Sequence, residues 1–356
     1  MTKLANKYVL AVACAAVALA APQIANAQDE KKEAGKSEVA ASGSLSLEGT
    51  SAEAHGPEAD KHPEGEHEEE AEETKFQVGV DLVFGFGKTN TVNTTLPGAQ
   101  ATVPDATVGP SKISTQSFII GAGYEIGKGI GIGARFPLTF GSWSQPGQQR
   151  RGTGAVGNVE LEGEYERHIN SQMKLVFGLG LALPTAQGTE VPEQEQLDAD
   201  KTAAQQNQNA YDRQAVNHAA AASRGYLDNA LFETKRLGII PMVGLDYKVS
   251  HILIDPFVKM ENLISTSGSP EHKYIGELVL GTFLGYELAK QMDAGVRVWG
   301  NILFAGESGA VGVLEPQMRF HFGNIHPLVA GIIPFAGDAL TSPRFGGIRF
   351  AVAARF

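Results

Sequence analysis

The stretch Phe76-Gln-Val-Gly-Val-Asp-Leu-Val-Phe-Gly-Phe86 alternates large apolar residues with small or polar ones along most of its length. Successive side chains of a β-strand point to opposite faces, so this alternation predicts a strand with one apolar face. The same period of two returns again and again through residues 76–356. We therefore expect an all-β domain over that range.

Connections of two lengths join the segments that share this alternation. Short turns, such as 127–129 and 288–291, alternate with long connections, such as 88–113 and 184–235. Short turns at one end and long loops at the other are typical of an outer-membrane barrel. We predict a transmembrane antiparallel up-and-down β-barrel of about 12 strands, within a range of about 10–14 because strand boundaries read from sequence shift by a few residues.

The composition narrows the class of protein. Only 19% of the residues are charged, below the ~25% of ordinary soluble domains, and the single cysteine is Cys14. The cysteine count excludes a disulfide-built domain, and the net charge of −11 excludes a basic nucleic-acid binder. No apolar run after residue 27 approaches the ~18 residues of a membrane helix. A soluble β-sandwich also alternates, but many strands here reach the ~9–11 residues of a tilted membrane strand.

The first 27 residues have the order of an export signal. Lys3 and Lys7 precede an apolar run, and Ala25-Asn-Ala27 gives a small-x-small cleavage pattern. We predict a signal peptide over 1–27, which implies a destination beyond the inner membrane. An even number of strands then places both ends of the barrel on the periplasmic side of the outer membrane.

Residues 28–75 carry most of the acidity of the chain. Low hydrophobicity with high net charge does not offset chain entropy, so we predict a disordered acidic periplasmic arm. His55, His62 and His67 stand among the carboxylates and are candidate ligands for zinc, nickel or copper. Their spacing matches no closed metal site, and a solvated linker or tether explains the arm better. We expect no cofactor.

The chain ends Ile348-Arg-Phe-Ala-Val-Ala-Ala-Arg-Phe356. This end resembles the C-terminal signature of outer-membrane β-barrel proteins, which closes with Phe after alternating apolar residues. The resemblance implies that Phe356 is an assembly signal read by the barrel assembly machinery. It also implies a lipid bilayer as the surroundings of the chain.

A second resemblance covers about thirty residues. Gly157-Asn-Val-Glu-Leu-Glu-Gly-Glu-Tyr165, followed by Leu179-Gly-Leu-Ala-Leu-Pro-Thr185, resembles a strand pair of the transporter-like barrels grouped with fatty-acid and aromatic-compound channels. Asn158 replaces the acid of that family's pattern, and Ala186 replaces its glycine. The resemblance implies the class of protein and no particular substrate.

The face of each strand opposite the lipid should line the interior, because faces alternate. Charges of both signs fall on that face, and they either select solutes by a transverse field or pair into ladders that brace the bore. Four carboxylates on one face of the strand near 160–166 repel unless cations meet them, and Arg135 and Lys174 are on the flanking strands. The candidate lumen residues are Arg135, Glu160, Glu162, Glu164, Lys174, Asp246, Lys259, Glu261, Glu277, Arg297, Glu315, Arg319 and Arg349.

The connection 184–235 is too long for an ordinary loop. Residues 198–234 are rich in Ala, Gln and Asn, and Ala and Gln favour helix. We expect a partly helical extracellular loop. A lid over the outer mouth, a constriction folded into the bore and a solvated excursion all fit the sequence.

These features favour a channel or transporter for small solutes, of unknown substrate, in the outer membrane. The alternative is a closed barrel with a structural or surface-interaction role. An outer-membrane hydrolase would need a nucleophile beside a base. No motif of that kind is present, and the serines of 265–269 fit an ordinary loop. We therefore expect no enzyme and no nucleic-acid partner.

Overall fold

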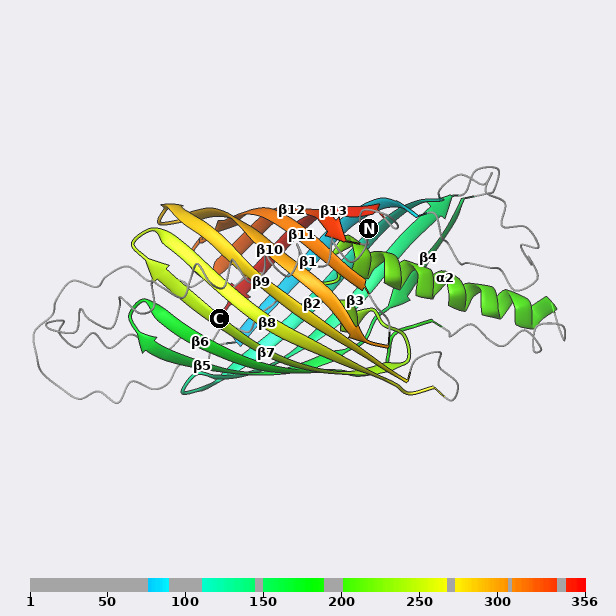
Figure 1. Ribbon diagram of the computed structural model, residues 1–356, viewed down its shortest axis with the longest axis horizontal. Coiled ribbons are helices and arrows are strands. Elements are labelled where there is room, and N and C mark those ends of the chain that lie inside the picture. The colour runs from blue at the N-terminus through cyan, green and yellow to red at the C-terminus, as the bar shows by residue number, and fades with distance from the viewer. Residues whose placement is uncertain are drawn as a thin grey trace, which may run out of the picture.

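The computed structural model describes residues 76–89, 111–144, 150–188, 201–267, 273–306, 309–337 and 344–356. They form one antiparallel β-barrel, and a helix enters it from one end (Figure 1). Its strands are β1 (Phe76–Thr89), β2 (Ser111–Gly127), β3 (Ile130–Ser144), β4 (Arg151–Val156), β5 (Glu160–Asn170), β6 (Met173–Ala182), β7 (Arg236–Val249), β8 (Ile252–Ser265), β9 (Tyr274–Ala289), β10 (Met292–Ala305), β11 (Gly309–Phe320), β12 (Ile325–Gly337) and β13 (Arg344–Arg355).

The barrel has twelve wall strands, because β4 and β5 are two pieces of one interrupted strand. Both pieces pair with β3, β4 opposite Leu138–Trp143 and β5 opposite Ile130–Arg135. Every other strand pairs with its neighbours in sequence, and β1 pairs with β13, which closes the ring. The prediction of a closed antiparallel barrel of about twelve strands is confirmed.

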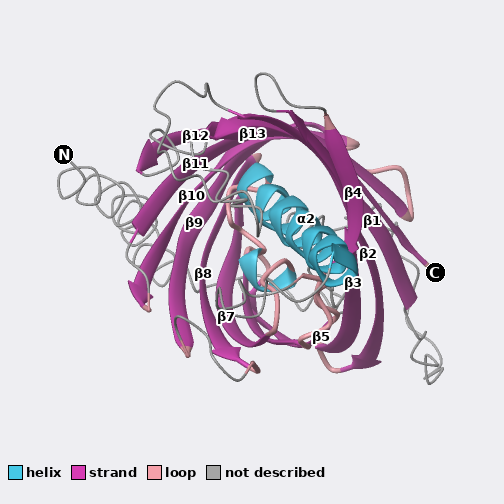
Figure 2. Cartoon of the chain, turned by 90° about the vertical axis from the view of Figure 1, so that its right-hand side faces the viewer, coloured by secondary structure: helices cyan, strands magenta, loops and turns pink. Residues whose placement is uncertain are grey.

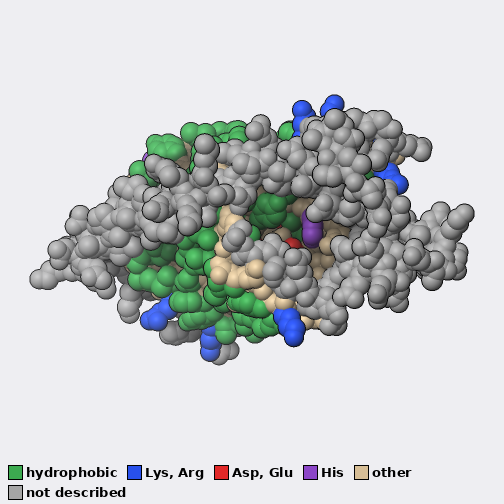
Figure 3. Space-filling view, turned by 45° about the vertical axis from the view of Figure 1, so that its right-hand side comes forward, with side chains coloured by type: hydrophobic (Ala, Val, Ile, Leu, Met, Phe, Trp, Pro, Cys, Tyr) green, Lys and Arg blue, Asp and Glu red, His purple; other side chains and the backbone are tan. Residues whose placement is uncertain are grey.

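The wall is apolar outside and mixed inside, as the period of two requires. In β1, Val80, Phe84 and Phe86 are exposed on the outer face, while Asp81 and Val83 are buried inside. Hydrophobic side chains cover much of the outer wall that is visible in Figure 3. Such a band suits the acyl chains of a bilayer, since water would not tolerate apolar exposure on this scale.

The two ends of the barrel differ. Tight turns close one end, including Gly127–Ile130 and the turn between β7 and β8, and we call the adjoining interior the short-turn half. The backbones of Phe76 and Phe356 also pair at that end. Longer connections join the strands at the other end, and we call its interior the long-connection half. Within the described ranges, no helix is both long and apolar enough to cross a membrane.

The connection between β6 and β7 runs into the barrel. It contains helix α2 (Lys201–Ser223) and the 3₁₀ turn η2 (Asn229–Leu231). Viewed from the long-connection end, α2 and η2 lie inside the ring of strands (Figure 2). Helix α2 contacts β1, β2, β3, β4 and β13, and η2 contacts β7 and β8. The helix predicted for this connection is present, and its final turns lie in the bore.

Candidate functional site: the plugged bore

Residues 216–232, which we call the plug, fill the middle and the long-connection half of the bore. Val216, Ala220, Leu231 and Phe232 have at most 1% of their surface exposed. Of the three interpretations of the long connection, the described part therefore fits a constriction folded into the bore. A solvated excursion does not fit these residues.

A connected chain of ion pairs crosses the bore and passes through the plug. Arg224, at the end of α2, contacts Asp81 of β1 at 2.9 Å and Asp228 of the plug at 3.3 Å. Asp228 is also 3.1 Å from Arg135 of β3. The plug thus supplies one cation and one anion to a chain whose other members belong to the wall.

The chain continues in both directions along the wall. Asp81 is 2.7 Å from Arg349 of β13, which is 3.2 Å from Glu315 of β11. At the other end Arg135 is 2.6 Å from both Glu160 and Glu162 of β5. These side chains are almost fully buried, except that Glu162 keeps 15% of its side chain exposed. Buried charges are tolerated because each is paired, and removing one partner would leave an uncompensated charge.

The interruption between β4 and β5 anchors the base of the plug. Asn158, which is 0% exposed, donates from Nδ2 to the carbonyl oxygens of Ala230 at 2.8 Å and Glu233 at 2.6 Å. The side-chain Oδ1 of Asn158 accepts from the backbone N–H of Ala186 at 2.8 Å. The backbone N–H of Asn158 donates to the Leu231 carbonyl at 2.6 Å. The strand therefore breaks where its backbone and side chain bind the plug in place of a neighbouring strand.

Two buried glutamates bind the 3₁₀ turn from the opposite wall. Glu261 of β8 accepts from the Ala230 amide at 2.7 Å, and Lys259 lies 3.0 Å from Glu261 while donating to the Leu227 carbonyl. Glu277 of β9 accepts from the side chain of Asn229. The turn thus has hydrogen-bond partners on both sides of the bore.

Apolar packing holds the tip of the plug against β1 and β9–β12. Leu227 packs with Val83, Val279, Val313 and Trp299 in one buried cluster. The indole Nε1 of Trp299 donates to the carbonyl of Gly225 at 3.0 Å. Gly225 has φ of +64°, and a Cβ there would lie 2.7 Å from the indole. Only glycine fits this position, because both the backbone angle and the space exclude a side chain.

The short-turn half is lined by charged groups outside the plug. Lys174 of β6 is 3.1 Å from Glu166 and 3.0 Å from Asp246. Arg319 is 3.5 Å from Asp255 and stacks over the ring of Phe283. The expected pairing of Arg135 and Lys174 with the carboxylates of β5 is confirmed.

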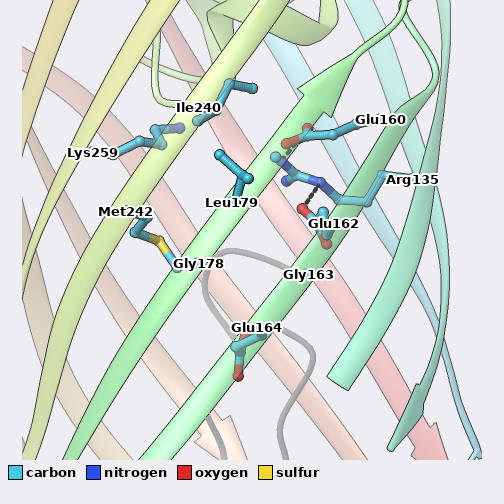
Figure 4. Close-up of a pocket in the computed structure, with 11 residues that line it drawn as sticks. Arg135, Glu160, Glu162, Gly163, Glu164, Gly178, Leu179, Ile240, Met242 and Lys259 are labelled. Atoms are coloured by element: carbon cyan, nitrogen blue, oxygen red, sulfur yellow. Dashed lines mark hydrogen bonds and ion pairs between the residues drawn. The ribbon is translucent and has the colours of Figure 1, made fainter. Parts of the chain in front are cut away.

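A small pocket lies beneath the plug, between β5, β6 and β7 (Figure 4). Arg135 lies between Glu160 and Glu162 at one side of it, while Lys259, Ile240 and Met242 approach from β7 and β8. Gly178 and Gly180 of β6 also line it, and a Cβ at Gly180 would lie 2.1 Å from the Glu160 carboxylate.

The candidate lumen residues all lie on the inner face of the described wall. Glu162 and Asp246 keep part of their surface exposed, and the others are buried: Arg135, Glu160, Glu164, Lys174, Lys259, Glu261, Glu277, Arg297, Glu315, Arg319 and Arg349. Eight of them belong to the ion pairs in and around the plug: Arg135, Glu160, Glu162, Arg297, Glu315, Arg349, Lys259 and Glu261. Whether any of them lines an open pore stays a prediction.

Sequence reasoning found Arg135, Lys259, Glu261 and Glu277 as inward residues but missed other members of the contacts between the plug and the wall. Asp81 stands at an inward position of the opening strand, and the period of two was signal enough to find it. Asn158 appeared only as a departure from an acidic pattern. Arg224 and Asp228 are four residues apart in the long connection, but nothing in their surroundings marks them as buried.

Other predictions concern residues outside the described ranges or have no test. The signal peptide 1–27, the arm 28–75 and its candidate ligands His55, His62 and His67 lie outside them. Among the described residues, no group of three or more His, Cys, Asp or Glu is placed to hold a metal ion. Phe356 pairs with the first strand, and its role as an assembly signal stays a prediction.

No protein-family model and no curated protein match the sequence. Similar solved structures are outer-membrane barrels. An outer-membrane channel from Pseudomonas putida F1 aligns with a TM-score of 0.49 at 10% identity, covering 79% of this chain and 95% of that chain. The KdgM porin aligns with a TM-score of 0.41 at 8% identity, covering 78% and 99%. Likenesses at this level do not decide function, which we infer from the site.

Proposed function

We propose that this chain is an outer-membrane channel for small solutes, and that the plug restricts its bore. The proposal is supported by a closed barrel that is apolar outside and charged inside. Outer-membrane barrels that conduct solutes have this distribution, because the lumen is wetted while the outer wall meets lipid. The arm and the C-terminus would then be periplasmic, and 184–235 would enter from the extracellular side.

One observation carries the proposal: polar contacts join the plug to the wall at several levels, in addition to the apolar packing of its tip. These contacts include those of Arg224, of Asp228 and of the plug residues that bind Asn158. Replacing a buried ion pair by apolar residues is often neutral or stabilising, so a barrel that only needed filling would not require them. Polar contacts can be exchanged for water when a segment moves, which suits an element that opens.

The second candidate is a closed barrel that binds surface partners and transports nothing. The burial of Trp299 and Phe232 favours it, because apolar packing of this kind opposes displacement of the plug. We expect no enzymatic activity in either case. The lipid bilayer and the barrel assembly machinery are the expected partners of both.

Single-channel conductance in a planar bilayer separates the two candidates. The refolded full chain should show small or brief openings, and deletion of 190–233 should give larger and longer ones. Folding is checked by heat-modifiable gel mobility. If both forms are folded and neither conducts, the channel proposal is wrong and the closed barrel remains.

A reversible cross-link tests the plug directly. The hydroxyl oxygens of Thr115 on β2 and Ser223 on α2 are 3.4 Å apart, so a Thr115→Cys, Ser223→Cys pair can form a disulfide with little movement. Cys14 is replaced by Ser so that only this pair can react. The oxidised protein should lose the openings of the full chain, and a reductant should restore them. Unchanged openings after complete oxidation would show that the plug does not control the current.

A further inference from the structure

Two histidines face each other at the short-turn end of the barrel, outside the plug. His321 follows β11 and His326 stands near the start of β12, so the tight turn between these strands brings the two imidazoles together. Backbone hydrogen bonds in both directions between Phe322 and Ile325 fix that turn. The two ring centroids are 5.7 Å apart, and the two Nδ1 atoms are 3.4 Å apart.

A carboxylate fixes the protonation of the first imidazole. Nε2 of His321 is 2.8 Å from Oδ2 of Asp293 on β10, and an ionised carboxylate accepts hydrogen bonds but does not donate them. Nε2 of His321 therefore carries the hydrogen, and the Nδ1 atom of the neutral ring presents a lone pair. Histidines that bind metals are oriented in this way, because a carboxylate accepts from the ring nitrogen that does not bind the metal.

The second imidazole is buried and incompletely bonded. His326 is 3% exposed, and its Nε2 has no hydrogen-bond partner in the described part of the chain. The 3.4 Å between the Nδ1 atoms exceeds the ~3.2 Å limit of an ordinary N–H hydrogen bond. The same separation matches the about 3.3–3.4 Å expected for two imidazole nitrogens that share one tetrahedral zinc ion at ~2.0–2.1 Å.

The charges around the pair decide which ions it suits. Asp293 is negative, and Arg355, which acts on His326 from the end of β13, is positive. Because these charges offset each other, the pair does not attract every cation. Zinc, copper and nickel ions bind imidazole well, whereas magnesium and calcium ions prefer oxygen ligands. The side chain of His321 keeps 14% of its surface exposed, which gives a dissolved ion access to the pair.

We propose that His321 and His326 bind one nitrogen-preferring divalent ion between their Nδ1 atoms. Asp293 is the positioning residue, since it holds the Nε2–H of His321. The described residues supply no third side chain to such an ion, so water or a ligand carried with the ion fills the remaining positions. The site lies outside the plug, and it goes beyond the proposed channel because a closed barrel would hold it equally well.

Titration of the folded full chain with metal ions tests the inference. Cys14→Ser is combined with replacement of His55, His62 and His67 by Gln, so that candidate ligands outside the described ranges do not contribute. Calorimetry of this parent protein should show saturable binding of Zn²⁺ and none of Mg²⁺. Electron paramagnetic resonance of the parent loaded with Cu²⁺ should show coupling to two imidazole nitrogens.

Single substitutions then assign the ligands. Asp293→Asn should weaken Zn²⁺ binding about 10–100-fold, as the loss of an outer partner of a metal-binding histidine does, and should keep the two-nitrogen copper spectrum. His321→Gln and His326→Gln should each weaken binding more and leave at most one coupled nitrogen.

His251→Gln is the matched control for these variants. Its Nδ1 is 3.5 Å from Glu287 at another short turn, and its ring packs on Tyr286 and not on a second imidazole. This variant should bind Zn²⁺ as the parent does. Heat-modifiable gel mobility checks the folding of each variant, and the copper spectrum of the parent decides the matter if a histidine variant does not fold.

Absence of Zn²⁺ binding to the folded parent would overturn the inference, and so would equal weakening by His251→Gln. A copper spectrum with fewer than two coupled nitrogens in the parent would do the same. Failure of the channel is a separate result, because it is read from the conductance of the 190–233 deletion and does not involve a metal ion.

Discussion

The same strands line both halves of the bore, but their inward side chains differ between the two halves. In the long-connection half the wall presents buried apolar or small inward residues, such as Val83, Ala182, Val313 and Ile332, beside the polar residues that bind the plug. In the short-turn half, which lies outside the plug, the wall presents buried charged inward residues such as Lys174 and Arg319. An apolar inner wall must be covered, whereas a charged one can pair with itself and face water.

The comparison shows that the polarity of the inward side chains depends on whether the plug or solvent lies against them. The plug extends to the level where apolar inward residues give way to Asp81 and Arg349, and the ion-pair chain lies at that boundary. The boundary should therefore be the most sensitive layer to mutation, and the two halves should respond differently.

The largest effect is expected at the boundary itself. Asp81→Ala leaves the guanidinium groups of Arg224 and Arg349 buried without their shared carboxylate, which should lower the free energy of unfolding by about 3–5 kcal/mol. Urea unfolding in lipid, followed by tryptophan fluorescence, measures the loss. Asp81→Asn, which keeps the shape and one acceptor, should lose less. A cost below that of Ile332→Val, which is described below, would contradict the role of this layer.

The second largest loss of stability is expected at the base of the plug, where Asn158 binds it. Asn158→Asp keeps an acceptor for Ala186 but turns a carboxylate toward the carbonyl oxygens of Ala230 and Glu233, at a cost of about 1–3 kcal/mol per unsatisfied group. We expect lower stability and more frequent channel openings. Asn262→Asp is the matched control, since Asn262 donates to Ile239 at an exposed position. Equal effects of the two variants would count against an anchoring role for Asn158.

A smaller loss is expected in the apolar half. Ile332→Val removes one methylene from the buried cluster around Leu227 and should cost about 0.5–1.5 kcal/mol. Ile333→Val on the same strand changes a side chain that is 50% exposed on the outer wall, and it should leave stability nearly unchanged. The difference between the two midpoints of urea unfolding measures how tightly the plug packs.

The smallest loss of stability is expected among the partly exposed ion pairs of the short-turn half. Glu287→Gln breaks partly exposed contacts with Lys248 and His251, and such pairs contribute about 0.2–1 kcal/mol. The loss should shrink as salt is added, because exposed charges are screened. Unfolding at low and high salt tests this point, and a loss that is independent of salt would place the pair in a drier environment than its exposure indicates.

Most of the wall was predictable from the sequence, and the plug was not. Period-two alternation such as Val80, Leu82 and Phe84 is a local signal, so strands, turns and the inward faces followed from it. The contact of Arg224 with Asp81 joins residues 143 apart in sequence, and no local pattern encodes it. Helix propensity in 198–234 indicated a helix but not its place.

One signal of the plug was present and overlooked. Inward positions near the long connections, including Val83, Val313 and Ile332, are apolar, although a water-filled lumen would favour polar residues there. An apolar inner face next to an overlong connection indicates that the connection folds inward. The pairing of Asn158 with the plug had no such signal, because a single amide in a strand has many possible partners.

The plug contacts the seam at which the first and last strands close the wall. Strands β1 and β13 are the first and last of the barrel, and they meet edge to edge. Asp81 lies on one side of that seam and Arg349 on the other, while Arg224 comes from the middle of the chain and contacts the same carboxylate. A wall that closed around an empty interior would bring Asp81 and Arg349 together but leave Arg224 outside. The start, middle and end of the domain therefore share one contact, which is complete only when the ring is closed and the plug lies inside it.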